Sequence, residues 1–209
     1  RNLKFLVKPM GFKHTGLFPE QAANWDKTGR MCKDSHERVN VLNLFGYTGG
    51  ASVALAASGA FVTHVDAAKG MVERCRQNAR LSGVPEDGIR YIVDDCKKFV
   101  LREIKRGKKY NAVLMDPPSY GRGPGGEVWK LEEQLYSLIG QCVPILTEKP
   151  LFFILNSYTT GLSPSVMEYL LGVQLQKRFG GKVSSDEIGL PVTSTGLVLP
   201  CGSTAIYEA

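Results

Sequence analysis

The chain has 209 residues, of which 43% are hydrophobic and 22% charged, and it carries a formal net charge of +6 at pH 7. This length and apolar content suit one domain with a sizeable core, and the mildly basic charge permits a polyanionic partner without requiring one. The first 25 residues hold no signal-peptide core, and no apolar run approaches the roughly 18 residues needed to cross a bilayer.

The cysteines are scattered along the chain, in an odd number and without a C-x-x-C pair: Cys32, Cys75, Cys96, Cys142 and Cys201. This pattern argues against a disulfide framework and a structural zinc site, and it favours a reducing compartment. We therefore expect a cytoplasmic protein with no metal and no membrane partner. The chain begins at Arg1 rather than Met, so it could be an excerpt that lacks a preceding domain.

Strand and helix patterns alternate after a less regular segment at 1–38. Short apolar runs rich in β-branched residues predict strands, and apolar residues at helical spacing predict helices. In chain order the pattern predicts a strand at 39–45, a helix at 51–58, a strand at 60–66, a helix at 68–81, a strand at 89–93, a helix at 97–105, a strand at 110–115, a helix at 131–142, a strand at 151–156, a helix opened by Ser163-Pro164, and two final strands between 182 and 208. This alternation is typical of a doubly wound α/β fold with a parallel sheet.

Chemically suggestive residues follow five of these strands. In a doubly wound fold the ligand binds at the carboxyl ends of the strands, so these residues should form one rim. They are Gly46, Gly49, Gly50, Asp66, Asp95, Asp116, Asn156 and Ser157.

The glycine-rich stretch "FGYTGG" lies directly before an alanine-rich helix. It is either a plain tight turn or a turn that lets a ligand reach backbone N–H groups at the start of the helix. Asp66 follows about 20 residues later, the spacing expected of a carboxylate that accepts both hydroxyls of a ribose, although a solvated strand-end acid is the alternative. The glycines fit neither G-x-G-x-x-G nor G-x-x-x-x-G-K-[ST], which disfavours dinucleotides and nucleoside triphosphates.

Four stretches together carry a family resemblance: "VLNLFGYTGG", "VTHVDAAKGMVERCRQNARLSG", "YIVDDCKKF" and "YNAVLMDPPSYG". The chain resembles the class I S-adenosylmethionine (SAM)-dependent methyltransferases, and within them the large-subunit ribosomal RNA methyltransferases whose first loop reads N-x-F-x-Y-T-G-G. The resemblance implies a Rossmann-like, mostly parallel seven-stranded sheet with an antiparallel last strand, and SAM as cofactor. The methyltransferase domain is then 39–209, and 1–38 is a lead-in segment with a cofactor-side loop, "HTGLFPEQ".

The resemblance also assigns residues to the cofactor. Asn43 stands where most methyltransferases carry an acid, and Phe45 and Tyr47 replace two of the usual glycines. Asp66 is assigned to bind the ribose hydroxyls. Asp95, together with the backbone N–H of Cys96, is assigned to bind the adenine edge, and Asp94 is the alternative to Asp95. His14, Phe18 and Glu20 lie in the segment that folds over the cofactor in relatives, or in an ordinary amphipathic loop. The full expected cofactor set is Phe18, Phe45, Gly46, Tyr47, Thr48, Gly49, Asp66, Ala67, Asp95, Cys96 and Asp116.

The catalytic candidates are Asp116, Pro117 and Pro118, which with Ser119 resemble the D-P-P-[YFS] motif beside the transferred methyl group. Alignment of an incoming lone pair with the C–S bond can contribute roughly 7–11 kcal/mol. Hydrogen bonds from a base amine to Asp116 and to the Pro117 carbonyl would favour that geometry, and the prolines present carbonyls without donors. The alternative is a plain turn that ends the strand.

Methylation of a cytosine carbon needs a cysteine thiolate, which relatives with that activity carry just after the fifth strand. Here that position reads "FILNSYTT", without a cysteine. Cys201 as a nucleophile is less favoured than a buried structural thiol. Direct in-line transfer to nitrogen is therefore preferred, with oxygen left open.

Two features point to RNA. Seven basic residues crowd the helix at 97–105 and the loop after it, as a solvated face or as a track for phosphates. In the loop "SYGRGPGGEVWKLEE", aromatic and cationic side chains suit an extruded base and a phosphate, although Trp129 could instead cap the core. The expected substrate-binding residues are Ser119, Tyr120, Arg122, Trp129 and Lys130.

The sequence thus predicts a SAM-dependent methyltransferase that acts on RNA, in particular ribosomal RNA, at a base nitrogen. Methylation of a small molecule or a protein is the alternative within enzymes. A SAM-binding or RNA-binding module without turnover is the alternative outside them, and a nicotinamide oxidoreductase is the least favoured because its glycine spacing is absent.

Overall fold

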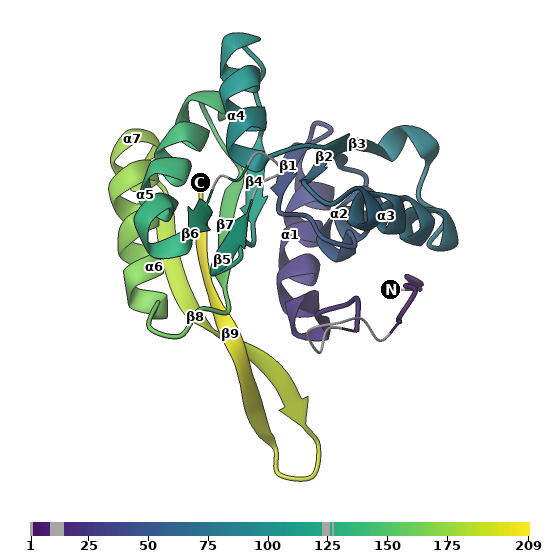
Figure 1. The fold of residues 1–209 in the computed structure, drawn as a ribbon. Helices are drawn as coiled ribbons and strands as arrows, with labels where there is room; N and C mark the ends of the chain where they lie inside the picture. Colours follow the sequence, from purple (N-terminus) through teal and green to yellow (C-terminus); the bar gives the residue numbers. More distant parts are fainter. Residues whose placement is uncertain (1, 9–14, 123–125, 127) are drawn as a thin grey trace.

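A computed structural model describes residues 2–8, 15–122, 126 and 128–209 (Figure 1). Its centre is a seven-stranded sheet in the order β3-β2-β1-β4-β7-β9-β8. The first five strands in this order are parallel, and β9 runs antiparallel to both of its neighbours. The predicted doubly wound fold and its antiparallel last strand are therefore confirmed. The strands are β1 (Asn40–Leu44), β2 (Phe61–Asp66), β3 (Ile89–Val93), β4 (Ala112–Met115), β7 (Phe152–Ser157), β8 (Lys182–Val192) and β9 (Leu197–Glu208).

Helices cover both faces of the sheet, and each layer has its own core (Figure 1). Strand β4 shows how the faces divide: Val113 and Met115 belong to one core, whereas Ala112 and Leu114 belong to the other, because successive strand side chains point to opposite faces. Helices α4, α5 and α6 cover the first face, and α1, α2 and α3 cover the second. The helices are α1 (Ala22–Asp34), α2 (Gly50–Ala56), α3 (Lys69–Leu81), α4 (Cys96–Lys105), α5 (Leu131–Cys142), α6 (Pro164–Leu171) and α7 (Lys177–Phe179).

Helix α1 lies within 1–38, where the sequence pattern predicts no regular element. The pattern is weak because Gly29 interrupts the helix and polar Asn24 and Thr28 occupy buried positions, where apolar residues would mark a helix face. Tertiary packing stabilises the helix where its own propensity is low. Trp25 is buried and packs so closely on Gly50 that a Cβ at position 50 would collide with the indole. The 3-10 turn η2 (Pro19–Gln21) leads directly into this helix.

The structure contains two antiparallel hairpins whose form the sequence pattern did not specify. Part of the glycine-rich loop after β4 forms a short antiparallel hairpin, β5 (Tyr120–Arg122) and β6 (Val128–Lys130). The outer halves of β8 and β9 extend away from the body as a two-stranded ribbon (Figure 1). Within the described ranges, no helix is long and apolar enough to span a membrane.

Candidate active site

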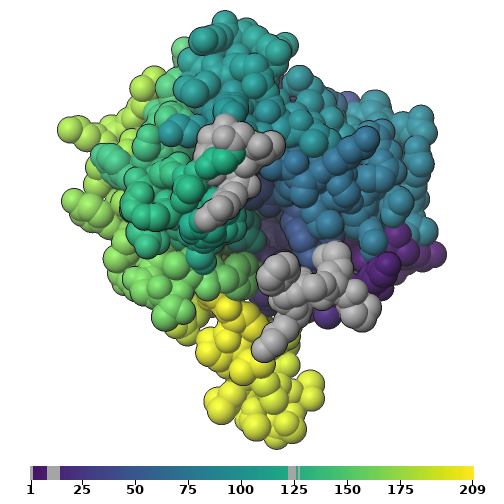
Figure 2. All heavy atoms as spheres, viewed as in Figure 1, coloured from purple at the N-terminus to yellow at the C-terminus, as the bar shows by residue number. Residues whose placement is uncertain are grey.

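A cavity of ≈1190 Å³ opens at the carboxyl ends of β1, β2, β4 and β7. Figure 2 shows a hollow on the face turned to the viewer, between the blue and the green parts of the chain. Pockets for single small ligands usually measure about 300–1,000 Å³, so this cavity has room for a second group beside a cofactor. The expected residues that line it are Phe18, Phe45, Gly46, Tyr47, Thr48, Asp66, Ala67, Asp95, Cys96, Asp116, Pro117, Pro118, Ser119, Tyr120 and Trp129.

Three members of the expected cofactor and substrate sets, and His14 from the cofactor-side loop, are not among these lining residues. Gly49 and Lys130 are described but do not line the cavity, although Gly50 does. The side chain of Arg122 lies outside the described part of the chain, as does His14. Gly49 instead acts as the residue before α2, with a left-handed φ of 86°.

The loop after β1 has an unusual backbone. Phe45 and Tyr47, which stand at two of the family's glycine positions, retain positive φ angles of 56° and 50°. Such a conformation costs a non-glycine residue about 1–2 kcal/mol, so the surroundings must hold it in place. Gly46 lies between them directly over the buried imidazole of His64, where a Cβ would overlap the ring.

A buried polar chain supports this loop from below. The Asn43 amide donates to Ser52 Oγ at 2.8 Å, and Ser52 Oγ lies 2.9 Å from His64 Nδ1. Burial lowers the pKa of His64 to about 4, with the Tyr47 backbone acting weakly in the opposite direction, so the imidazole is neutral at physiological pH. The amide at Asn43 thus takes part in a neutral network.

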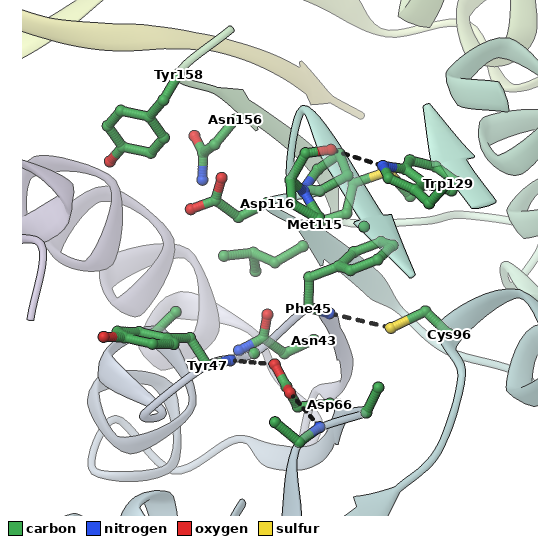
Figure 3. A pocket seen from close by; sticks show the side chains of 18 of the residues that line it. Asn43, Phe45, Tyr47, Asp66, Cys96, Met115, Asp116, Trp129, Asn156 and Tyr158 are labelled. Atoms are coloured by element: carbon green, nitrogen blue, oxygen red, sulfur yellow. Dashed lines mark hydrogen bonds between the residues drawn. The ribbon is translucent and has the colours of Figure 1, made fainter. Parts of the chain in front are cut away.

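Asp66 ends β2 at the edge of the cavity (Figure 3). The backbone N–H of Tyr47 donates to Oδ2 at 2.9 Å, and that of Ala68 donates to Oδ1 at 2.8 Å. Burial raises the pKa of this carboxyl above its ordinary value, while the two N–H donors act in the opposite direction. Each oxygen keeps a lone pair for a ligand hydroxyl, which suits the expected ribose role.

Of the two carboxylates after β3, Asp95 lines the cavity and Asp94 does not. Asp94 is ion-paired with Arg102, whereas Asp95 Oδ1 caps α4 by accepting from Lys98 N at 2.8 Å. Cys96 Sγ lies 3.2 Å from the backbone N of Phe45 and ties α4 to the loop after β1. This arrangement favours Asp95 for the adenine edge, an assignment that stays a prediction.

Asp116 follows β4 and lies in the cavity wall (Figure 3). Burial, and after it the negative charge of Glu20, raise the pKa of this carboxyl from 3.8 to about 7. Among the described residues, no hydrogen-bond donor holds it in the charged form. Pro117 is buried and Pro118 exposed, so the turn is anchored on one side and open on the other.

A polar wall beside Asp116 includes residues that the sequence did not single out. Gln21 Nε2 donates to the Tyr158 hydroxyl at 2.8 Å, and the Asn24 amide reaches Asn156 Oδ1 and Thr204 Oγ1, each at 3.2 Å. Figure 3 shows the Asn156 amide and the Asp116 carboxylate facing each other. Asn156 had a sequence signal, its place at a strand end, and Gln21 ends the "HTGLFPEQ" segment. The other residues come together through contacts between distant segments.

The β5–β6 hairpin closes another side of the cavity. Trp129 Nε1 donates to the Pro118 carbonyl at 2.6 Å, and its ring lies 5.5 Å from that of Phe45. The indole thus braces the Asp-Pro-Pro turn, while Tyr120 is 53% exposed. Lys130 is exposed and paired with Glu133 at 2.7 Å.

The comparisons with known proteins agree with this geometry. Residues 3–146 match the family model described as S-adenosylmethionine-dependent methyltransferase. The chain belongs to this family. The methyltransferase is 29% identical over 146 residues to ribosomal RNA large subunit methyltransferase K/L of Shewanella frigidimarina, with 69% of this chain and 20% of that protein covered. It is 32% identical over 119 residues to ribosomal RNA large subunit methyltransferase I of Klebsiella pneumoniae, with 56% of this chain and 29% of that protein covered.

Solved structures give the same relationship. The crystal structure of a SAM-dependent methyltransferase from Agrobacterium tumefaciens superposes with a TM-score of 0.91 at 37% identity, covering 99% of this chain and 67% of that one. A methyltransferase solved in complex with S-adenosylhomocysteine (SAH) superposes with a TM-score of 0.73 at 22% identity, covering 93% of this chain and 50% of that one. The chain spans between a fifth and a third of the length of the two ribosomal RNA methyltransferases above.

The cofactor of the methyltransferase is therefore SAM, and the residues present suit it. The left-handed loop after β1 brings backbone close to the cavity, Asp66 offers two oxygens with free lone pairs, and Phe45 offers an apolar ring beside Cys96. No three His, Cys, Asp or Glu side chains converge as a metal site would require within the described part of the chain.

Proposed function

We propose that this methyltransferase transfers the methyl group of SAM to a base nitrogen of RNA, with ribosomal RNA as the foremost candidate. The observation that carries the proposal is Asp116: a carboxylate in the cavity wall at the end of β4 that has no donor among the described residues. A half-buried acceptor of this kind is suited to an incoming N–H group, because a desolvated carboxylate without a donor is costly until one arrives.

Asp116 would act on the nucleophile. Accepting a hydrogen bond from the amine orients the nitrogen lone pair toward the methyl carbon. As the N–C bond forms, the electron pair of the C–S bond stays on sulfur and the amine becomes acidic. With a pKa raised to about 7, Asp116 is basic enough to take the released proton and pass it to water.

The positions of the cysteines favour methylation of a base nitrogen over methylation of a base carbon. Among the residues that the structure describes, Cys96 is the one cysteine that lines the cavity, and it lies on the side of Asp66 and Asp95, away from Asp116 (Figure 3). Burial raises the pKa of its thiol well above the usual range, so it is held as an unreactive thiol. Cys201 lies on β9 and does not line the cavity.

Three features favour RNA as the acceptor. The relatives named above are ribosomal RNA methyltransferases by name. The cavity volume of ≈1190 Å³ exceeds what a single ligand usually needs, which suits a cofactor together with a flipped-out base. Exposed Tyr120 lies directly after the Asp-Pro-Pro turn and could stack on that base.

The test is transfer of labelled methyl groups from SAM by the purified protein. Unmodified large-subunit ribosomal RNA made by transcription, a pool of small metabolites, and a protein extract freed of RNA serve as the three acceptors. We expect label in RNA, and in a methylated base nitrogen when the digested nucleosides are analysed by mass spectrometry. Label confined to metabolites or protein would refute the RNA proposal, and label on a base carbon would refute the role of Asp116.

A further inference from the structure

Positive charge is concentrated in one short part of the chain. Residues 94–109 contain seven Lys or Arg and three Asp or Glu, a net charge of +4, so the other residues together contribute only +2 of the total of +6. Helix α4 occupies most of this stretch and covers one flank of the sheet (Figure 1).

The acidic residues of this stretch are already engaged. Asp94 is ion-paired with Arg102, and Asp95 caps the start of α4. Glu103 is fully buried and paired with Arg106 at 2.9 Å. The ion pairs engage Arg102 and Arg106, and Asp95 uses one carboxylate oxygen to accept from the backbone N–H of Lys98.

Two of the remaining lysines lie on one side of α4. Lys97, Leu101 and Lys105 are spaced by four residues and therefore share one face of the helix; we call them the α4 stripe. Neither lysine of the stripe has an acidic partner among the described residues. An ammonium group without a partner, on a protein of modest overall charge, is available to an external anion.

The stripe begins in the cavity. Lys97 and Leu101 line the cavity wall together with Lys98, and Lys105 continues the same face to the last residue of the helix. At a rise of 1.5 Å per residue, the stripe extends for about 12 Å, a length over which a nucleic-acid strand presents several phosphates. By contrast, Lys130 of the hairpin is neutralised by Glu133 and does not line the cavity.

We propose that the α4 stripe is the surface along which the RNA strand leaves the active site, with Lys97 and Lys105 contacting phosphates on one side of the target nucleotide. The proposal rests on the proposed function and adds the path of the substrate. Exposed Leu101, between the two lysines, offers an apolar contact for a sugar or a base. The stripe carries affinity and leaves the choice of base to the cavity.

The test is RNA binding measured against salt concentration. The probe is unmodified large-subunit ribosomal RNA made by transcription, bound to wild type and to the double variant Lys97→Gln/Lys105→Gln. Each phosphate contact to a single strand contributes about 0.7 to the slope of log K against log salt, so the double variant should lose about 1.4 from that slope and bind roughly tenfold more weakly at low salt. SAM affinity measured by calorimetry should stay unchanged in the single variant Lys105→Gln, because Lys105 does not line the cavity.

The matched control is Lys33→Gln/Lys177→Gln, which removes the same charge from two exposed lysines on α1 and α7. Equal loss of RNA affinity in both double variants would assign the effect to net charge and would refute the proposed RNA contact of the α4 stripe. A wild-type salt slope in Lys97→Gln/Lys105→Gln, with RNA still methylated, would overturn the stripe and leave the proposed function standing. Failure of the wild type to bind or methylate any RNA would instead overturn the proposed function.

Discussion

Phe45 and Tyr47 hold conformations that glycine adopts far more readily, in the loop after β1 that lines the cavity. Their side chains offset that cost. The Phe45 ring packs against Trp129, and the Tyr47 ring lies 5.7 Å from that of Phe18. The family's glycine positions are thus filled here by aromatic residues that keep the glycine-like backbone and add packing across the cavity.

Gly46 is a position in this loop where a side chain has no room, because a Cβ there would overlap the His64 ring. We expect Gly46→Ala to weaken SAM binding by at least about tenfold, roughly 1.4 kcal/mol, because the new methyl group would displace the loop from the His64 ring. Calorimetric titration with SAM measures the effect. Gly70→Ala is the control, since a Cβ at Gly70 meets no atom within 4 Å; equal affinity in both variants would contradict the role of His64 as the floor of the loop.

The raised pKa of Asp116 predicts how activity depends on pH. The carboxyl must be ionised to accept an N–H group, so kcat/KM should fall as the pH decreases through about 7, the folded-state pKa. Because the charge of Glu20 contributes to that pKa, Glu20→Gln should move the acidic limb of the profile to lower pH. A limb that stays in place in Glu20→Gln, or is absent from the wild type, would show that Asp116 does not control the rate.

At the scale of elements, the site is assembled where separate parts of the chain meet the strand ends. The β5–β6 hairpin reaches the Asp-Pro-Pro turn through Trp129, while α1 and η2 bring Asn24 and Gln21 to the other side. The Asp-Pro-Pro turn is therefore held between two elements that do not belong to the central sheet. Its position depends on both.

Trp129 tests the bracing of the turn by the hairpin. In Trp129→Phe the aromatic contact with Phe45 can persist, but the hydrogen bond to the Pro118 carbonyl is lost. We expect kcat to fall about three- to tenfold, as the loss of a neutral hydrogen bond of about 1 kcal/mol implies, with little change in SAM affinity. Steady-state kinetics measure both. A loss confined to RNA affinity would instead assign the indole to base stacking.

At the scale of the whole molecule, two hydrophobic cores on opposite faces of one sheet hold the cavity at its edge. The cavity lies where the order of parallel strands reverses, between β1 and β4, because the chain crosses to opposite faces on either side of that point. A ligand there contacts elements of both layers. Binding should therefore stabilise the fold as a unit.

Thermal unfolding tests that coupling. At a concentration of SAH one hundred times its Kd, the free energy of unfolding should rise by about 2.7 kcal/mol, which appears as an increase in Tm. Asp66→Ala should largely lose the increase at the same ligand concentration, because the ribose acceptor is gone and the Tyr47 and Ala68 N–H groups lose their partner. An unchanged increase in Asp66→Ala would refute the ribose assignment.

The sequence by itself determined the strands, their alternation with helices and the residues at the strand ends. Buried parallel strands are short continuous apolar runs, and the chain must place its ligand-facing residues just after them, so Asp66, Asp95 and Asp116 could be located from local pattern alone. The family resemblance added the cofactor.

Only the tertiary structure decided the parts that depend on long-range contact. Helix α1 forms although its own sequence is a weak helix signal, because Trp25 finds the space above Gly50. In the polar wall, Asn24 is hydrogen-bonded to Thr204, 180 residues away in the chain. Arg102 forms an ion pair with Asp94, which distinguishes this carboxylate from that of Asp95. Such pairings arise from where the folded chain brings side chains together, which neither periodicity nor motif spacing encodes.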